Sequence, residues 1–239
     1  MSELPLVLAV HGTRNPAGGQ VSEGLRAAVA DRLPGVEVRL GWVDIHTPTV
    51  TDTLTELGPC VVVPCFLTAG YHVESDLPEA AATAGGQAVI TALIGDEIFD
   101  AVVQRLTESG ALEPANPADA VVLAHAGSLR EQSVAEVHAV ADRLSRRLGR
   151  PVVAAFLSAA GPDVGSAVAE LRAGGHRRIA IASYLLAPGI FHSRLAGFGA
   201  DVVAEPIGVH PLLIEGILRR YAEAVAPVVP AGSPVRVPE

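Results

Sequence analysis

The chain is poor in aromatic residues and has no excess of positive charge, and each shortage excludes a class of protein. Phe, Trp and Tyr make up 4% of its 239 residues, so the core must consist mainly of Val, Leu, Ile and Ala. A net charge of −9 argues against a nucleic-acid-binding protein, which needs a basic face. No apolar run approaches the roughly 18 to 20 residues that cross a membrane, so we expect no membrane partner.

Cysteine is also scarce, with only Cys60 and Cys65 in the whole sequence. Two thiols cannot supply the four ligands usual for an iron–sulfur cluster. Their spacing places them on opposite faces of one strand, which disfavours a mutual disulfide. We therefore expect reduced core residues in a cytoplasmic protein. The apolar run at residues 6–10 has no basic stretch before it, which indicates a strand and not a signal peptide.

Apolar residues are plentiful, at 49% of the chain with a mean hydropathy of +0.38, and they belong to a sequence that repeats itself. Residues 7–12 (VLAVHG) return as residues 121–126 (VVLAHA), an offset of about 114 residues that brings His11 and His125 into register. The length suits two domains of about 110 to 120 residues. The repeat therefore predicts two copies of one fold.

A second match between the copies shows that they do not share one set of polar residues. Residues 66–72 (FLTAGYH) return as residues 185–191 (LLAPGIF), so that Phe191 stands in the second copy where His72 stands in the first. Copies that keep a scaffold but not its histidines predict a single site, held by the first copy and covered by the second.

Short β-branched runs alternate with longer segments of helical period, which predicts an α/β fold of two tandem lobes, each a parallel sheet flanked by helices, with a cleft between them. We expect a lobe at 1–112 that carries the site, a duplicated lobe at 113–226 and a frayed proline-rich tail at 227–239. The expected strands are 6–10, 36–43, 61–66, 88–93, 120–124, 151–157, 178–184 and 201–204, the helices of the first copy are 21–33, 48–57, 76–84 and 96–106, and the linker is 109–119.

Two histidines follow strands of the first copy. His11 comes directly after the 6–10 strand, and His72 comes six residues after the 61–66 strand. Ligands of open α/β sheets gather at the carboxyl ends of the strands, so both imidazoles are expected at the same edge. Imidazole suits iron, cobalt, nickel and zinc, and two such ligands would make an open site for a metal that is handed on. Alone, each histidine also fits a loop or core role.

The residues after His72 and the remaining histidines admit several roles. Glu74 is either a third ligand, a proton carrier or a solvated carboxylate. Asp76 precedes Pro78 and is typical of a helix N-cap, and Thr47 before Pro48 is typical of another. His192 and His125 of the second copy face the cleft in one interpretation and are structural in the other. Structural or solvent-facing roles are expected for His46, His138, His176 and His210.

Three segments carry a resemblance to a known family. Residues 8–14 (LAVHGTR), 66–78 (FLTAGYHVESDLP) and 206–211 (PIGVHP) are similar to the "HGSR", "FLxxGxHxxxDIP" and "PLGxHP" segments of the sirohydrochlorin chelatase family. The likeness covers nearly the whole chain, and the second segment is the most specific. Thr13 replaces the usual Ser, and there is no histidine-rich loop.

The resemblance implies a class II chelatase with two flavodoxin-like lobes that enclose a tetrapyrrole cleft. Members of the family insert Fe²⁺, Co²⁺ or Ni²⁺ into sirohydrochlorin without ATP or any permanent organic cofactor. By this resemblance His11 is the proton acceptor and a metal ligand, and His72 is the second ligand. As a candidate ligand or proton carrier beside His72, Glu74 is added to the expected catalytic set. The residues implied to bind the tetrapyrrole are Thr47, Leu67, Thr68, Ala69, Gly70 and Tyr71. We add Arg14, because an acidic chain must recognise a polycarboxylate through local groups.

The resemblance also implies a monomer that acts as an internal pseudo-dimer, since a one-lobe form of the family pairs as a homodimer. Iron for siroheme is our first choice of metal and cobalt for cobalamin the second. The competing hypothesis is a non-catalytic carrier of tetrapyrrole or metal that uses the same cleft. Hydrolases and histidine phosphatases are disfavoured, because the chain has no G-x-S-x-G elbow and Val10, not Arg, precedes His11.

Overall fold

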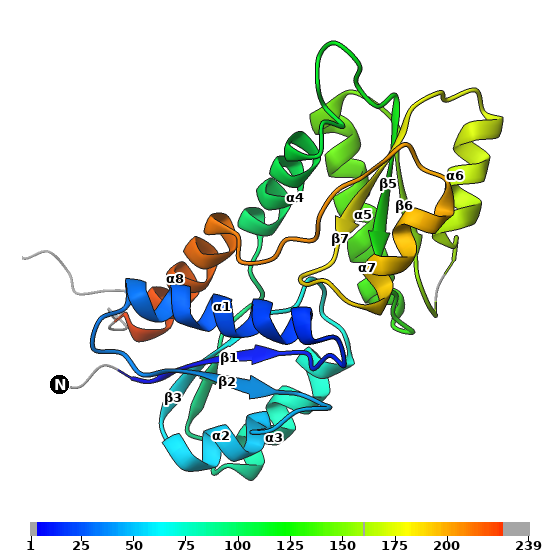
Figure 1. Ribbon diagram of the computed structural model, residues 1–239. Helices are drawn as coiled ribbons and strands as arrows, with labels where there is room; N and C mark the ends of the chain where they lie inside the picture. The colour runs from blue at the N-terminus through cyan, green and yellow to red at the C-terminus, as the bar shows by residue number, and fades with distance from the viewer. Residues whose placement is uncertain (1–3, 160, 227–239) are drawn as a thin grey trace, which may run out of the picture.

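The computed structural model describes residues 4–159 and 161–226, which form two lobes, each built on a four-stranded parallel sheet (Figure 1). The expected fold class is confirmed. The first sheet has the order β2-β1-β3-β4, with β1 at Leu6–Val10, β2 at Val38–Trp42, β3 at Cys60–Pro64 and β4 at Ala88–Ile90. The second sheet has the order β6-β5-β7-β8, with β5 at Ala120–His125, β6 at Val152–Phe156, β7 at Ile179–Tyr184 and β8 at Val202–Val203.

The two sheets follow the same plan, and the two central strands of each are buried along their whole length. Every residue of β1, β3, β5 and β7 is buried, as expected of parallel strands covered on both faces. β1 pairs in parallel with both β2 and β3, so the carboxyl ends of these three strands share one edge. The prediction that the segments containing His11 and His72 begin at the same sheet edge is therefore confirmed.

Helices cover both faces of each sheet (Figure 1). Those of the first half are α1 at Pro16–Arg32, α2 at Val50–Leu57, a π-helix at His72–Asp76, α3 at Leu77–Thr83 and α4 at Asp96–Glu108. Those of the second half are α5 at Glu131–Leu148, α6 at Val164–Ala173, α7 at Ile190–Leu195, a 3-10 turn at Ala196–Phe198 and α8 at Pro211–Val225.

The last helix of each half packs on the other half. Helix α4 lies against β7 of the second sheet, and α8 returns to lie against β3 and α1 of the first lobe (Figure 1). The hydroxyl of Tyr221 in α8 donates a 2.6 Å hydrogen bond to the carbonyl of Leu4, and Arg105 in α4 donates to the carbonyl of Ile207. One hydrophobic cluster therefore runs through both lobes, while the division at residue 112 stays a prediction.

Three local expectations were wrong. Helix α1 begins at Pro16, five residues before the expected start, because the Asn15 side chain caps it by accepting from the Ala17 amide. Helix α2 begins at Val50, and its N-cap is Thr49, not Thr47, because Thr49 forms a reciprocal capping box with Asp52.

Asp76 is the third case. It is not a side-chain N-cap, because its carboxylate bonds to His72 while its backbone is helical.

The two cysteines are free, buried and in different core clusters, as predicted. Within the part of the chain that the structure describes, no helix is long and apolar enough to cross a membrane. The expected tail at 227–239 lies outside the described residues.

Candidate metal centre

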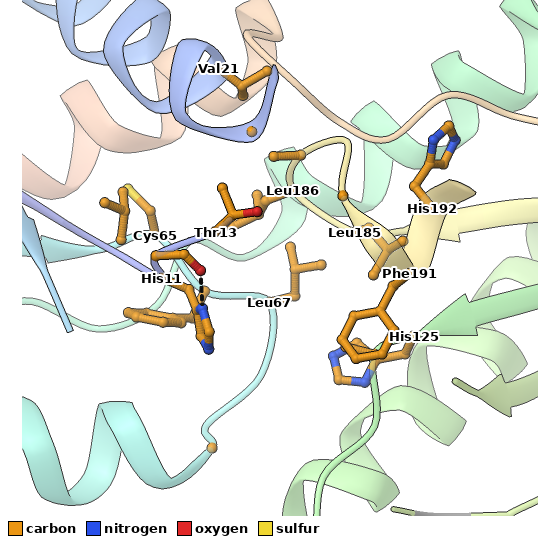
Figure 2. A pocket seen from close by; sticks show the side chains of 18 of the residues that line it. His11, Thr13, Val21, Cys65, Leu67, His125, Leu185, Leu186, Phe191 and His192 are labelled. Carbon is orange, nitrogen blue, oxygen red and sulfur yellow. Dashed lines mark hydrogen bonds between the residues drawn. The ribbon is translucent and has the colours of Figure 1, made fainter. Parts of the chain in front are cut away.

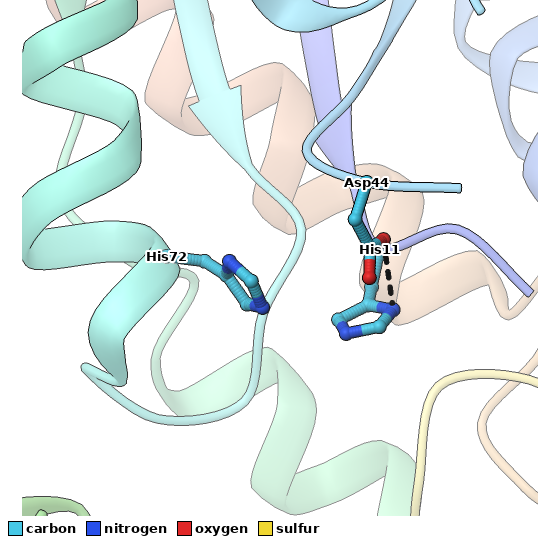
Figure 3. A group of neighbouring side chains, drawn as sticks. All are labelled: His11, Asp44 and His72. Atoms are coloured by element: carbon cyan, nitrogen blue, oxygen red, sulfur yellow. Dashed lines mark ion pairs between the residues drawn. The ribbon is translucent and has the colours of Figure 1, made fainter. Parts of the chain in front are cut away.

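Three side chains from three adjacent strand ends converge at the edge of the first sheet. His11 directly follows β1, Asp44 follows β2, and His72 opens the π-helix that comes after β3. One potential ligand atom from each of them lies within 4.8 Å of the others, and Figure 3 shows the two imidazoles facing one another beside the carboxylate. Two imidazoles and one carboxylate form a donor set that proteins use for iron(II) and other divalent metals.

The orientation of His11 is fixed through its Nδ1 atom. This atom lies 2.7 Å from the carbonyl oxygen of Gly12 and 3.3 Å from Oδ1 of Asp44. The carbonyl can only accept, so Nδ1 carries the proton and the lone pair of the neutral ring is on Nε2. The side chain is 53% exposed, which leaves Nε2 open to a ligand.

His72 is oriented in the same way by a carboxylate. Its Nδ1 atom lies 2.5 Å from Oδ2 of Asp76, while its ring packs beside Phe66. The rings of His72 and His11 are 5.0 Å apart between centroids and nearly perpendicular, at 81°. Histidine ligands of metals commonly donate their other ring N–H to a carboxylate or a carbonyl, and both partners are present here.

Asp44 was missed by the sequence reasoning. It is held by the backbone amide of Gly12, which donates a 2.8 Å hydrogen bond to Oδ1. The approach of the two loops is close, since a Cβ atom on Gly12 would lie 2.3 Å from the carbonyl oxygen of Asp44. The rule of strand ends applies to Asp44 as it does to His11, but the sequence does not show that β2 is the neighbour of β1.

Glu74 lies outside this group of three. Its carboxylate forms an ion pair with Arg130 of the second lobe, and the same guanidinium lies over the ring of Tyr71, 5.6 Å from its centroid. A role for Glu74 in catalysis therefore stays a prediction. His46 is structural, as expected, because Nε2 lies 2.6 Å from the Thr13 carbonyl.

His11 and His72 line a cavity of about 930 Å³ between the two lobes, and Figure 2 shows side chains of both lobes facing it. This volume is at the upper end of the range for small-molecule sites. Thr47 and Ala69 are not among the residues that line the cavity. Of the residues expected to bind a tetrapyrrole, those that line it are Arg14, Leu67, Thr68, Gly70 and Tyr71.

The charge of the cavity wall differs from that of the whole chain. The sequence has a net charge of −9, yet no Asp or Glu is among the described residues that line the cavity. Arg14 is the one permanently charged side chain among them, and the N-terminus of α1 begins two residues later. A helix N-terminus and a guanidinium both favour anions, so this cavity suits a polycarboxylate better than the composition predicts.

The second lobe contributes a different surface to the cavity. His125 is in register with His11 but is 7% exposed, and burial lowers its pKa to about 4. Its Nδ1 atom accepts from the Gly127 amide at 3.1 Å, so the neutral ring carries its proton on Nε2. Phe191 and His192 line the same wall (Figure 2). Among the described residues, the group of potential metal ligands is confined to the first lobe.

Comparison with known proteins agrees with this duplicated architecture. The CbiX family profile matches the sequence twice, over residues 5–109 and 120–224. The chain belongs to the CbiX family. The two matches correspond to the two repeats, and each spans one four-stranded sheet of the structure.

Solved structures share the fold of this CbiX-family chain. SirB from Bacillus subtilis with Fe³⁺ aligns with a TM-score of 0.77 at 21% identity, covering 93% of this chain and 96% of that one. A sirohydrochlorin chelatase SirB from Bacillus subtilis subspecies spizizenii in complex with cobalt aligns with a TM-score of 0.74 at 20% identity, covering 93% and 95%. At these identities the likeness shows the fold.

Curated relatives match over a single stretch of sequence. The sirohydrochlorin cobaltochelatase of Methanococcoides burtonii is 33% identical over 85 residues, which is 33% of this chain and 65% of the relative. The sirohydrochlorin cobaltochelatase of Methanopyrus kandleri is 32% identical over 79 residues, which is 31% of this chain and 55% of the relative. The chain thus spans less than two thirds of the length of these relatives.

Proposed function

We propose that this CbiX-family protein inserts a divalent metal ion into sirohydrochlorin. The observation that carries the proposal is the position of His11, Asp44 and His72, whose ligand atoms lie within 4.8 Å of one another. The two histidines also line a cavity of about 930 Å³. The names of the curated relatives support the substrate. The cavity supports it too, since an anion-favouring rim around apolar walls suits a macrocycle with carboxylate side chains.

Metal insertion releases two pyrrole N–H protons as the ring nitrogens take the ion. In our proposal Nε2 of His11 and of His72 hold the ion together with Asp44. When the ion leaves an imidazole, the lone pair on Nε2 becomes free, so the same atom accepts a proton from the macrocycle. Metal and proton compete for one site, and exchange of one for the other keeps the charge near the ring balanced.

The number of ligands suits a metal that is delivered and not retained. Three protein donors leave coordination positions open, whereas structural sites are usually closed by four. The cavity lies directly beside the donors, so the macrocycle and the ion are brought together without diffusion, which is catalysis by proximity. We place Fe²⁺ first and Co²⁺ second as the metal, because a set of two histidines and a carboxylate is common for iron(II).

The decisive experiment is anaerobic turnover with sirohydrochlorin and one metal at a time, followed by the absorbance of the macrocycle. Many turnovers per protein molecule are expected, and His11→Ala and His72→Ala should each reduce the enzyme-dependent rate to background. A shift that stops at one equivalent would instead indicate a carrier. Near-normal rates in both variants would disprove the metal site, and competition between Fe²⁺ and Co²⁺ would rank the metals.

A further inference from the structure

Helix α5 of the second lobe contacts the segment of the first lobe that carries His72. Ser133 Oγ donates a 2.7 Å hydrogen bond to Thr68 Oγ1, and the backbone amide of Ala69 donates at 2.9 Å to Glu136 Oε2. Two further contacts come from Arg130, the residue before α5: its guanidinium pairs with Glu74 and donates at 3.2 Å to Ser75 Oγ.

The three residues of the second lobe lie on one face of the helix. Ser133 and Glu136 are three positions apart in α5, a spacing that aligns side chains along a helix, and Arg130 stands at its N-cap. We call them the α5 clamp. Because a helix is rigid over two turns, the clamp holds two short segments of the first lobe at fixed positions. Thr68 and Ala69 lie before His72, and Glu74 and Ser75 lie after it.

The clamp contacts are buried or charge-assisted hydrogen bonds, which fix the position of the loop that precedes His72. Ser133 is fully buried and Thr68 is 8% exposed, so each hydroxyl depends on the other for its hydrogen bond. The bond from the Ala69 amide goes to a carboxylate, and hydrogen bonds to charged groups are about twice as strong as neutral ones. Tyr184 of β7 adds a 3.2 Å hydrogen bond to the carbonyl of Leu67.

The equivalent loop of the second lobe is held differently. Residues 185–191 lie against α1, where a Cβ atom on Gly18 would be 2.9 Å from the carbonyl oxygen of Pro188. Among the described residues, no hydrogen bond or ion pair joins a side chain of α1 to this loop. The loop that contains Phe191 is therefore packed against its neighbour, whereas the loop that contains His72 is fastened by polar bonds.

The polar contacts and the candidate metal ligands therefore occur at the same one of the two loops. If the contacts served only to join the lobes, either loop could carry them equally well. They occur at the loop whose histidine must meet His11. The π-helix itself has no side-chain cap at its N-terminal residue, so its position depends on contacts from outside.

We propose that Arg130, Ser133 and Glu136 are positioning residues for the metal ligand His72. This inference rests on the proposed function, because it assigns the second lobe a role at the same site. The second lobe, which lacks the ligand group, sets the distance between the two imidazoles through α5. The affinity and the coordination geometry of the site therefore depend on side chains that do not touch the metal.

The test is a titration of the purified protein with Co²⁺ alone, read by the visible absorption of the bound ion. Ser133→Ala, Glu136→Ala and Arg130→Met are each expected to weaken Co²⁺ binding about 10-fold, the lower end of the effect of removing outer-shell partners of a metal site. Each should also change the shape of the visible spectrum. Glu136→Gln and Arg130→Lys, which keep a hydrogen-bonding group, should restore most of the affinity.

The matched control is Glu131→Gln, an exposed position on the same helix that makes none of these contacts. It should bind Co²⁺ with the affinity and spectrum of the parent. The thermal midpoint of each variant shows whether it is folded, and the partly buried positions Arg130 and Glu136 test the inference even if Ser133→Ala unfolds the chain.

Two outcomes separate this inference from the function on which it rests. The first outcome is that folded clamp variants keep the parent's Co²⁺ affinity and spectrum while His72→Ala loses binding. This outcome would overturn the inference and would still support the metal site. Parent-like Co²⁺ binding in both His72→Ala and His11→Ala would instead disprove the metal site itself.

Discussion

Oδ2 of Asp76 lies 2.5 Å from Nδ1 of His72, and Asp76 follows His72 by four residues in the chain. The contact turns the imidazole so that Nε2 is the atom available to a ligand, and it places a negative charge behind that ligand. His11 has the corresponding bond to the Gly12 carbonyl. Both imidazoles are therefore oriented by acceptors within their own loops.

Removal of this acceptor should weaken metal binding without loss of the fold. In Asp76→Ala the ring of His72 is free to rotate, and we expect Co²⁺ affinity to fall about 10- to 100-fold. Asp76→Asn keeps an oxygen that can accept from Nδ1, so its loss should be smaller. Isothermal titration of Co²⁺ into both variants checks the order, and equal affinities in Asp76→Ala and the parent would contradict it.

Asp44→Asn tests the third donor. The amide oxygen can still accept from the Gly12 amide, which keeps the two loops together, but the carboxylate is lost as a charged ligand. Affinity for Co²⁺ should fall by at least about 10-fold, with a change in visible absorption that reports the altered coordination. Glu74→Gln, which lies outside the three-residue group, should leave the affinity much closer to that of the parent. The reverse order would make Glu74 the third ligand.

The pH dependence of stability should contain a contribution from His125. Burial lowers its pKa to about 4, whereas an unfolded histidine titrates near 6.5. Between these values the unfolded chain binds a proton that the folded chain does not. Stability is therefore lost as the pH falls from about 6.5 to about 4, by about 3 kcal/mol in all, and the contribution is constant below that range.

The variant that isolates this contribution is His125→Asn, which has no titrating ring but retains an acceptor for the Gly127 amide. Urea unfolding at pH 7 and at pH 5 should show the parent losing about 2 kcal/mol more than the variant. Parallel losses in the two proteins would show that His125 is accessible to protons in the folded state.

The packing of α8 against the first lobe gives a prediction about stability alone. Gly216 of α8 faces Ile94, and a Cβ atom there would lie 2.4 Å from Ile94 Cγ2. Gly216→Ala should destabilise the protein by about 1–3 kcal/mol, because the contact is overpacked. Gly19→Ala in α1 has nothing within 4 Å of the new methyl group and should stabilise by about 0.5–1 kcal/mol. Urea midpoints that shift in the same direction would contradict this pair.

The sequence was sufficient for the architecture and for part of the site. The repeat predicted two equal sheets, and the structure has them with the same strand order. The alternation of strands and helices placed the segments of His11 and His72 at one edge of the sheet, because parallel strands end at a common edge. These inferences depend on periodicity along the chain, which a single sequence contains.

What the sequence could not supply was the choice of neighbours in space. Asp44 joins the site because β2 lies next to β1, and strand order is decided by packing and not by any local pattern. The N-caps show the same limit at short range. Thr47 and Thr49 are both able to cap α2, and Asp76 is able either to cap α3 or to bond elsewhere. Asp52 decides the first case and His72 the second, by bonding to the side chain concerned.

The crossing of α4 and α8 has a consequence for the integrity of the molecule. A chain cleaved between residues 109 and 119 would leave each fragment with its own sheet and with the helix that belongs over the other. Neither fragment could complete a core alone, and only recombination of the two pieces would rebuild both. Each half of the repeat is thus completed by a helix of the other half.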